Sequence, residues 1–511
     1  MWAVISLDTD YKNELTASEP WLVKNGVGIQ IMETLAMGAF LTALAVDLGA
    51  SNLTIGILAA IPHLAQLAQI PALFTVEHIR QRRRIYMIAG YIARPMLLVI
   101  AAAALLPMAD VALTTIALAF LVRYVAGAFL ACSWSSWMRD LVPDKEMGRV
   151  FGNRQKRMIG IGIVFSLLAA GFIDGWQALT PWPKPWAYTI IYTLAFFGGA
   201  YSVWATKHIF EPPMAPSITV VSWTSRLREP FRNANYRRLI VFLASWNFAI
   251  NLAAPFFTVH MLRTMELDLF TVIGLATLSQ GAAYLMVSQW GAIADRFNNK
   301  SVMLVCGPMF VGSIFAWTFT TMPEVHSLTI PLLILIHIAT GTASAGITLA
   351  SGNLTMQLAP KNNATSYLAA SSLVNSTAAA IATMAGGLTA DLLARWELSL
   401  VLSWRSETTS LQMEALSFTH WDFFFFFATL IGLFSLNRLT RVEEGGGAPE
   451  RAVLNALGVS MRQGIRNLST IAGLHGATEF PIDAIEDELK AAPDDQDDVV
   501  PDPTQEDDQK P

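Results

Sequence analysis

Long apolar runs recur along the chain, and short polar segments separate them. Each run is roughly 20 residues long, enough for a helix to cross a hydrocarbon core of about 30 Å. The pattern predicts an all-α membrane protein with twelve transmembrane helices. Longer polar stretches follow the sixth span (207–237) and precede the last (395–419). The predicted spans are 26–48, 53–76, 85–106, 111–137, 157–174, 186–206, 238–262, 269–293, 301–321, 328–352, 366–391 and 420–437.

Two landmarks indicate that the chain repeats itself. Glu77, after the second span, and Asp295, after the eighth, are 218 positions apart. Pro143, after the fourth span, and Pro360, after the tenth, are 217 apart. A shared offset favours duplication of a six-span unit, with two pseudo-symmetric bundles related by an axis along the membrane normal. The predicted parts are an arm (1–25), a first bundle (26–206), a central loop (207–237), a second bundle (238–437) and a tail (438–511).

The charges support a membrane protein and orient it. Only 14% of the residues are charged, against about 25% in a typical soluble domain. The loops after even-numbered spans, with the central loop and the start of the tail, hold 21 Lys and Arg, and the opposite loops hold four. Because basic loops stay in the cytoplasm, we expect an inner-membrane protein with both termini cytoplasmic. The basic patches lie in short loops against the lipid bilayer, which argues against nucleic-acid binding.

The last thirty residues differ from the rest of the chain. Segment 482–511 has twelve acids and two lysines, a net charge of −10 within a total of −5. Such a segment cannot bury enough apolar surface to fold alone. We expect it to be disordered, and a cytoplasmic protein partner is one possible use for it.

Short motifs resemble those of the major facilitator superfamily. The segment 291–300, GAIADRFNNK, is similar to that family's loop signature, which the first-half copy at 73–82 matches less well. The fourth span has Arg123 followed four residues later by Gly127, similar to the family's fourth-span motif. The resemblance implies a major facilitator-type transporter, without a subfamily. It also implies that loop residues gate the two halves, with Asp295 reaching Arg149 and Arg154 in the outward-facing state. The predicted gating residues are Glu77, Arg80, Arg82, Arg149, Arg154, Gly291, Asp295, Arg296 and Lys300.

Charges inside the spans are the leading candidates for a substrate or proton site, because a buried charge needs a partner, a wet cavity or a function. Glu33 lies in the first span, and Asn251 is its repeat mate 218 positions on. Arg123 stays protonated, so Glu33 is its expected partner. Arg94 precedes Pro95 in the third span. For each charged residue the alternative is a purely structural contact between helices.

Uncharged polar residues extend the predicted pathway. His63 and Gln66 lie in the second span, Asn247 and Asn251 in the seventh, and His337 in the tenth. A lone buried histidine is often only a packing residue, and many such groups simply join helices.

The sequence shows no Walker motif, metal-ligand cluster or nucleophile–base pair. It therefore predicts no cofactor, no metal and no catalytic residues. The function expected is a secondary transporter that moves a small solute by alternating access, with protons as the coupling ion. The alternative is a transporter-like sensor or assembly factor that binds a partner through its tail.

Overall fold

A computed structural model describes residues 2–214, 223–321, 326–360, 364–405, 410–418 and 420–444. The chain divides into two compact units, Met1–Leu454 and Asn455–Pro511. The second unit, with the acidic segment 482–511, lies outside the described residues. The first half contains α1 (Trp2–Ala36), α2 (Ala39–Asp47), α3 (Asn52–Ala65), η1 (Gln66–Ala68), α4 (Gln69–Ile79), α5 (Arg82–Ala93), α6 (Met96–Ala103), α7 (Ala109–Leu141), α8 (Asp144–Leu179) and α9 (Pro185–Thr206). The second half contains α10 (Trp223–Arg232), α11 (Ala234–Arg263), α12 (Leu269–Arg296), α13 (Asn299–Trp317), α14 (Thr329–Gln357), α15 (Ala364–Leu393), β1 (Leu398–Arg405), β2 (Ser410–Phe418) and α16 (His420–Leu439).

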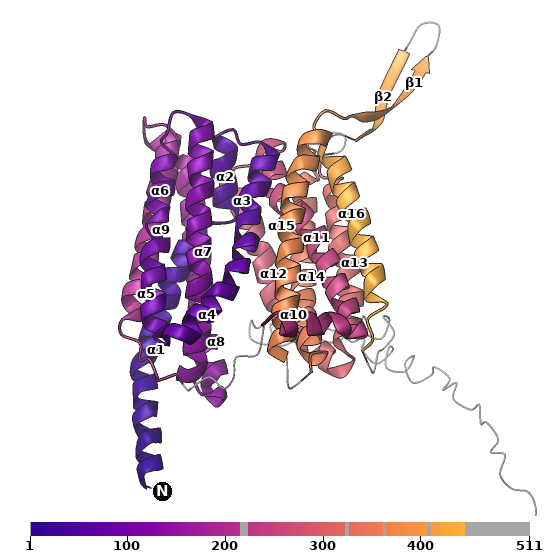
Figure 1. Ribbon diagram of the computed structural model, residues 1–511. Helices are drawn as coiled ribbons and strands as arrows, with labels where there is room; N and C mark the ends of the chain where they lie inside the picture. Colours follow the sequence, from indigo (N-terminus) through magenta and orange to yellow (C-terminus); the bar gives the residue numbers. More distant parts are fainter. Residues whose placement is uncertain are drawn as a thin grey trace, which may run out of the picture. The chain divides into compact units, whose positions relative to one another are not determined.

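The predicted all-α membrane fold is confirmed. In the described part of the chain, eleven helical segments are long and apolar enough to cross a membrane. The remaining span is the sixth, α9, whose 22 residues extend about 33 Å at 1.5 Å per residue. Within the first half α9 packs along α1, and within the second half α11 packs along α15 and α16. Figure 1 shows the indigo-to-purple helices of the first half beside the magenta-to-yellow helices of the second.

Three spans of the first half are interrupted. The first breaks between α1 and α2, where Gly38 has a φ of 60°. The second breaks at η1, shortly after Pro62. The third breaks at Arg94–Pro95, because proline has no N–H to donate and disfavours helix in the residue before it. Their repeat mates α11, α12 and α13 are each continuous, although Pro255 and Pro308 lie inside two of them.

Some elements were not predicted. Residues 2–25, expected as an arm, are helical and continuous with the first span. The central loop contains α10, which packs against α15. The stretch 395–419 contains an antiparallel hairpin, in which β1 pairs with β2 and the register shifts between Leu400 and Val401. The alternation of apolar and polar residues in LSLVLSWR (398–405) is the signal that predicts a strand.

Two names for the ends of the bundles are used below. The hairpin end is where α3 and α12 begin and where α15 leads toward β1. The basic end is where α5 and α13 begin and where Arg82, Arg149 and Asp295 lie. Figure 1 shows the hairpin beyond α15 and α16, and the start of α1 at the opposite end.

Candidate solute-binding site and gates

Glu33 and Arg123 form an ion pair inside the first half. Arg123 Nη2, on α7, donates to Glu33 Oε1, on α1, at 2.6 Å. The Arg123 side chain is 3% exposed and that of Glu33 is 37% exposed, so the carboxylate can be reached from a cavity while the guanidinium is enclosed. The rings of Phe120 and Tyr124 lie 5.9 and 5.0 Å from the guanidinium carbon, which adds cation–π attraction.

A cavity of about 210 Å³ adjoins this ion pair. The interrupted second span contributes Gln66 and Gln69, and the Gln69 amide donates to Gln66 Oε1. The Tyr124 hydroxyl contacts Met37 Sδ at 2.7 Å, beside the break in the first span. Irregular backbone at membrane depth is tolerated where it borders protein or a cavity. The polar residues that line the cavity are Glu33, Gln66, Gln69, Arg94, Arg123 and Tyr124.

Arg94 is the third charge of this cavity and is only 7% exposed. The Tyr86 hydroxyl is its hydrogen-bonding neighbour, and its Nε has no partner in the described part of the chain. Gly199 on α9 makes room for it. A Cβ at that position would lie 2.8 Å from Arg94 Cδ and 2.7 Å from Met32 Sδ, so any larger residue would displace the arginine.

The second half has a cavity of about 600 Å³ between α11, α14 and α15, and none of the described residues that line it is charged. Asn247 lines this cavity, and its amide donates to the Leu243 carbonyl at 2.8 Å. Trp246 Nε1 and Asn375 Oδ1 also belong to the lining, and both are buried without a hydrogen-bond partner among the described residues.

The remaining predicted pathway residues have different surroundings. Asn251 donates to the Asn247 carbonyl at 2.8 Å and is the hydrogen-bonding neighbour of His63 in the other half. His337 Nδ1 lies 2.8 Å from the Leu333 carbonyl oxygen, and its ring packs edge-on against Trp317. His337 lines none of the cavities described here, so its contacts are those of a packing residue.

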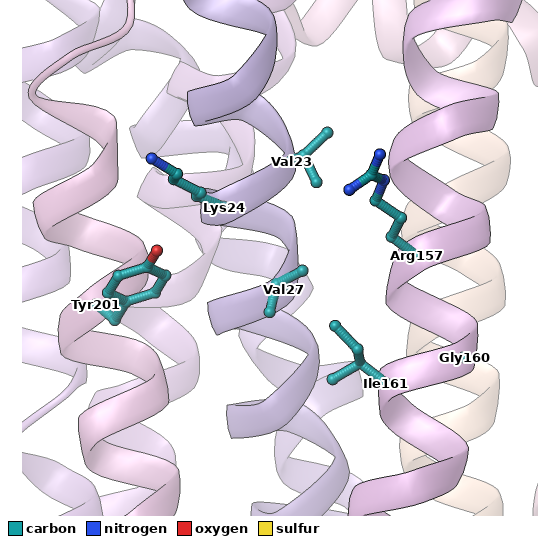
Figure 2. Close-up of a pocket in the computed structure, with 7 residues that line it drawn as sticks. All are labelled: Val23, Lys24, Val27, Arg157, Gly160, Ile161 and Tyr201. Carbon is teal, nitrogen blue, oxygen red and sulfur yellow. The ribbon is translucent and has the colours of Figure 1, made fainter.

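A further groove of about 390 Å³ lies between α1, α8 and α9. Figure 2 shows Lys24 and Arg157 on opposite sides of Val23 and Val27, with Tyr201 on the third helix. The Lys24 ammonium lies 3.8 Å from the Trp21 ring centroid. None of the predicted pathway residues lines this groove.

Two carboxylates join the halves at the hairpin end. Asp391, near the end of α15, accepts hydrogen bonds from the backbone N–H groups of Asn52 (3.1 Å) and Leu53 (2.9 Å) at the start of α3. Asp174, near the end of α8, accepts from the N–H groups of Leu269 (3.1 Å) and Phe270 (2.6 Å) at the start of α12. Unpaired N–H groups and the helix dipole make such a terminus favourable for an anion. We call these contacts the two locks.

The two locks are related by the internal repeat. Asp174 and Asp391 are 217 positions apart, as are Leu53 and Phe270. Each half therefore supplies one carboxylate and receives one at its own helix N-terminus. The duplication of the chain has produced a pair of equivalent contacts.

Close backbone packing supports the locks. A Cβ on Gly387 would lie 2.4 Å from the Asn52 carbonyl oxygen, and one on Gly56 would lie 2.4 Å from the Thr383 carbonyl oxygen. Such distances require that a backbone move, so α3 and α15 meet here only because both positions are glycine. Arg263 on α11 adds hydrogen bonds to the Ala50 carbonyl and to Asn52 Oδ1.

The expected gate contact at the basic end is not made in this conformation. Asp295 is exposed and forms no hydrogen bond or ion pair with any residue that the structure describes. Arg149 instead pairs with Glu19 and Glu146. Arg154 Nε donates to the Leu22 carbonyl at 3.2 Å, and its guanidinium lies over the Trp134 ring. Both arginines contact their own half, because the halves are joined at the other end.

Arg82 and Lys300 also contact their own halves in this conformation, and their predicted gating role stays a prediction. Arg82 is fully buried and donates to Asp140 and to the Pro212 carbonyl. Lys300 Nζ donates to the Thr440 and Val442 carbonyls at 3.0 and 2.7 Å. Each anchors the start of a third span, α5 or α13, to the chain that follows the sixth span of its half.

The other predicted gating residues have local contacts. Arg80 has a left-handed backbone, with φ 59°, where α4 ends, and Glu77 lies half-buried one turn earlier. The Arg296 guanidinium lies 5.3 Å from the Phe297 ring centroid. A Cβ on Gly291 would meet only Leu349 at 3.8 Å, an ordinary contact. This conformation therefore does not require glycine at 291.

The model of the Major Facilitator Superfamily matches residues 26–383, well over half of the chain. The chain belongs to the major facilitator superfamily. It is thus a multi-pass membrane transporter for a small solute, and not an enzyme. No curated protein matches it in sequence.

Solved structures of other transporters share the superfamily fold. The nucleoside transporter NupG matches with a TM-score of 0.61 at 13% identity, over 83% of this chain and 98% of its own. A bacterial homologue of the iron transporter ferroportin, in an inward-facing state, matches with a TM-score of 0.61 at 9% identity, over 83% and 98%. A POT family transporter in complex with a thioalcohol-conjugated peptide matches at 0.57 and 13%, over 84% and 96%. At these identities the likeness concerns the fold alone.

Sequence reasoning missed several residues of this superfamily member's site and gates. Asp174 and Asp391 lie at the ends of predicted spans, where a charge is unremarkable, but their 217-residue offset is the signal that identifies them as a pair. Tyr124 was overlooked beside Arg123. Gly199, which makes room for Arg94, has no sequence signal, since its role depends on which helix packs against α9.

Proposed function

We propose that this protein is a secondary active transporter that moves a small solute across the inner membrane by alternating access, with protons as the coupling ion. The observation that carries the proposal is the asymmetry between the two ends. Among the described residues, all hydrogen bonds between the halves that involve helix termini lie at the hairpin end. Polar cavities in both halves lie between these contacts and the basic end.

The orientation follows from the charges. The loops at the basic end hold most of the lysines and arginines outside the spans, which favours a cytoplasmic location for that end and for both termini. The described conformation is then inward-facing. In the outward-facing state the basic end would close, and Asp295 would reach Arg149 or Arg154.

Glu33 is the group proposed to carry the proton. Its carboxylate is the more exposed partner of the pair with Arg123, so a proton can reach it from the cavity. Protonation removes the negative charge and leaves the Arg123 guanidinium without its counterion. Because an unpaired buried charge is costly, that state favours entry of a solute or a change of conformation, which couples the two events.

Transport by purified protein in liposomes tests the proposal. We expect Glu33→Gln to abolish proton-driven uptake while leaving solute exchange measurable, because the amide keeps the shape of the side chain but cannot carry the coupled proton. The matched control is Glu397→Gln, which changes an exposed glutamate outside the spans. Undiminished proton-driven uptake in Glu33→Gln would remove Glu33 from the coupling mechanism.

The tail offers a separate experiment. A cytoplasmic partner for residues 445–511 remains a prediction, since this segment lies outside the described residues. If the protein without this segment transports as well as the full chain, the tail serves something other than transport. Absence of any solute flux in the full chain would favour the sensor or assembly role instead.

A further inference from the structure

The cavity of the first half contains one more positive charge than negative. Arg94 and Arg123 both line it, and Glu33 is the single carboxylate among its lining residues. Its other polar lining groups, Gln66, Gln69 and Tyr124, are neutral. A buried charge at membrane depth is unfavourable unless it is paired or solvated, so this excess of one positive charge requires an explanation.

The Glu33 carboxylate is already paired with Arg123. Glu33 Oε1 accepts from Arg123 Nη2 at 2.6 Å, whereas Arg94 has the neutral Tyr86 hydroxyl as its hydrogen-bonding neighbour. The Nε atoms of both arginines lack partners in the part of the chain that the structure describes. The unsatisfied groups of the two guanidiniums are therefore hydrogen-bond donors, and what is missing is an acceptor with a negative charge.

The geometry points to a carboxylate as the group that the solute places beside Arg94. This inference rests on the proposed transport function and adds the chemical class of its solute. One carboxylate neutralises an excess of one positive charge, and its two oxygens match the planar guanidinium fork. A phosphate group, with a charge of about −1.5 to −2 at neutral pH, would leave the cavity negative.

The second half fits the remainder of such a solute. None of the described residues that line its larger cavity is charged. The buried groups of this lining without a hydrogen-bond partner among the described residues are a donor, Trp246 Nε1, an acceptor, Asn375 Oδ1, and the Ser371 hydroxyl, which can donate or accept. The two halves would then bind different parts of the solute. The first holds its charged end, and the second holds an uncharged part with both donor and acceptor groups.

Saturation-transfer NMR on the purified protein tests the assignment with acetate and acetamide, which have the same shape and differ in charge. We expect saturable transfer to the methyl group of acetate and much weaker transfer to that of acetamide. Arg94→Gln should weaken acetate binding at least roughly tenfold, the loss expected for a hydrogen bond to a charged group. Arg395→Gln, an exposed arginine outside the spans, should leave acetate binding unchanged.

Two further variants keep the test decisive if Arg94→Gln does not fold. Arg94→Lys retains the charge without the fork and should bind acetate more weakly than the wild type. Gly199→Ala should also weaken binding, because its Cβ would displace Arg94. Equal transfer to acetate and acetamide, or acetate binding that is the same in every Arg94 and Gly199 variant, would overturn the inference.

The outcome separates this inference from the proposed function. Acetate binding that depends on Arg94 in a protein without solute flux would support the site and refute the transporter. Proton-driven flux of a neutral or cationic solute, with acetate binding independent of Arg94, would support the transporter and refute the carboxylate.

Discussion

The hairpin end and the basic end were built by the same duplication, yet in the described part of the chain the halves are joined at the hairpin end and not at the basic end. At the hairpin end, Asp174 and Asp391 each bind the first N–H groups of a helix in the opposite half. At the basic end, Asp295 is exposed, and Arg149 and Arg154 contact their own half. In the proposed alternating access, one state has the halves joined at one end and separated at the other. The difference teaches that, among the described residues, the locks rather than the superfamily's loop signature join the halves in this conformation.

The glycine contact at the hairpin end should be the most sensitive part of this comparison. Gly387→Val would place a branched side chain where even a Cβ is 2.4 Å from the Asn52 carbonyl oxygen. We expect the free energy of the closed hairpin end to become less favourable by about 1–3 kcal/mol, the usual destabilisation caused by overpacking. The electron paramagnetic resonance distance between spin labels at Gln177 and Arg395, on opposite halves of the hairpin end, should lengthen in this background.

The matched control for that variant is Gly281→Val on α12, where a Cβ would meet nothing within 4 Å. If both variants behave alike, the effect belongs to valine in a helix rather than to the contact between the halves. The proposed role of Gly387 would then be wrong.

Neutralising both locks should have the next largest effect. A carboxylate at a helix N-terminus contributes about 0.3–1 kcal/mol, so Asp174→Asn with Asp391→Asn should cost the closed hairpin end about 0.6–2 kcal/mol if the locks are independent. That cost lowers the ratio of closed to open hairpin end by roughly 3- to 30-fold. Electron paramagnetic resonance distances across this end measure the ratio.

The pseudo-symmetry makes this prediction sharper. Because the two locks are equivalent, each single variant should cost about half of the double variant, whereas Asp110→Asn, an exposed acid at the start of α7, should cost nothing measurable. Strongly unequal effects of Asp174→Asn and Asp391→Asn would contradict the equivalence.

The smallest effect should come from Asp295→Asn. This variant should stabilise the closed hairpin end, whereas the previous variants destabilise it. Asp295 is exposed and forms no hydrogen bond or ion pair with a described residue, so its neutralisation should not weaken the closed hairpin end. If it stabilises the other state, the variant should raise the population of the closed hairpin end, by no more than about 1 kcal/mol. The same distance measurement checks this sign, and a lower population would refute the gate role.

Much of the fold could be predicted from sequence, and the missing parts have physical reasons. Apolar runs of spanning length identify helices regardless of tertiary context, and the 217-residue offset reveals the two halves. The ion pair of Glu33 and Arg123 could be predicted, because a buried charge requires a partner. The hairpin at 398–418 could not be placed from span length, because a polar stretch between two spans is typical of a loop. Only the alternation of apolar and polar residues within it indicates strands.

The gates could not be predicted because they depend on conformation. If the protein alternates as proposed, its sequence specifies two states, and the resemblance of the loop around Asp295 to the superfamily's signature implies a contact of the other state. Contacts such as that of Gly387 with Asn52 depend on how two helices from different halves cross. The offset between Asp174 and Asp391 can be found in the sequence, but only the structure shows which helix N-termini donate hydrogen bonds to them.

Distances measured at both ends in the same preparation test the central claim most directly. Spin labels at Gln177 and Arg395 would report the hairpin end, and labels at Lys145 and Ala292 the basic end. All four residues are exposed, and Cys132 and Cys306 would first be replaced by serine. We predict that the double lock variant lengthens the hairpin-end distance and shortens the basic-end distance together. Lengthening at the hairpin end with an unchanged basic end would contradict alternating access.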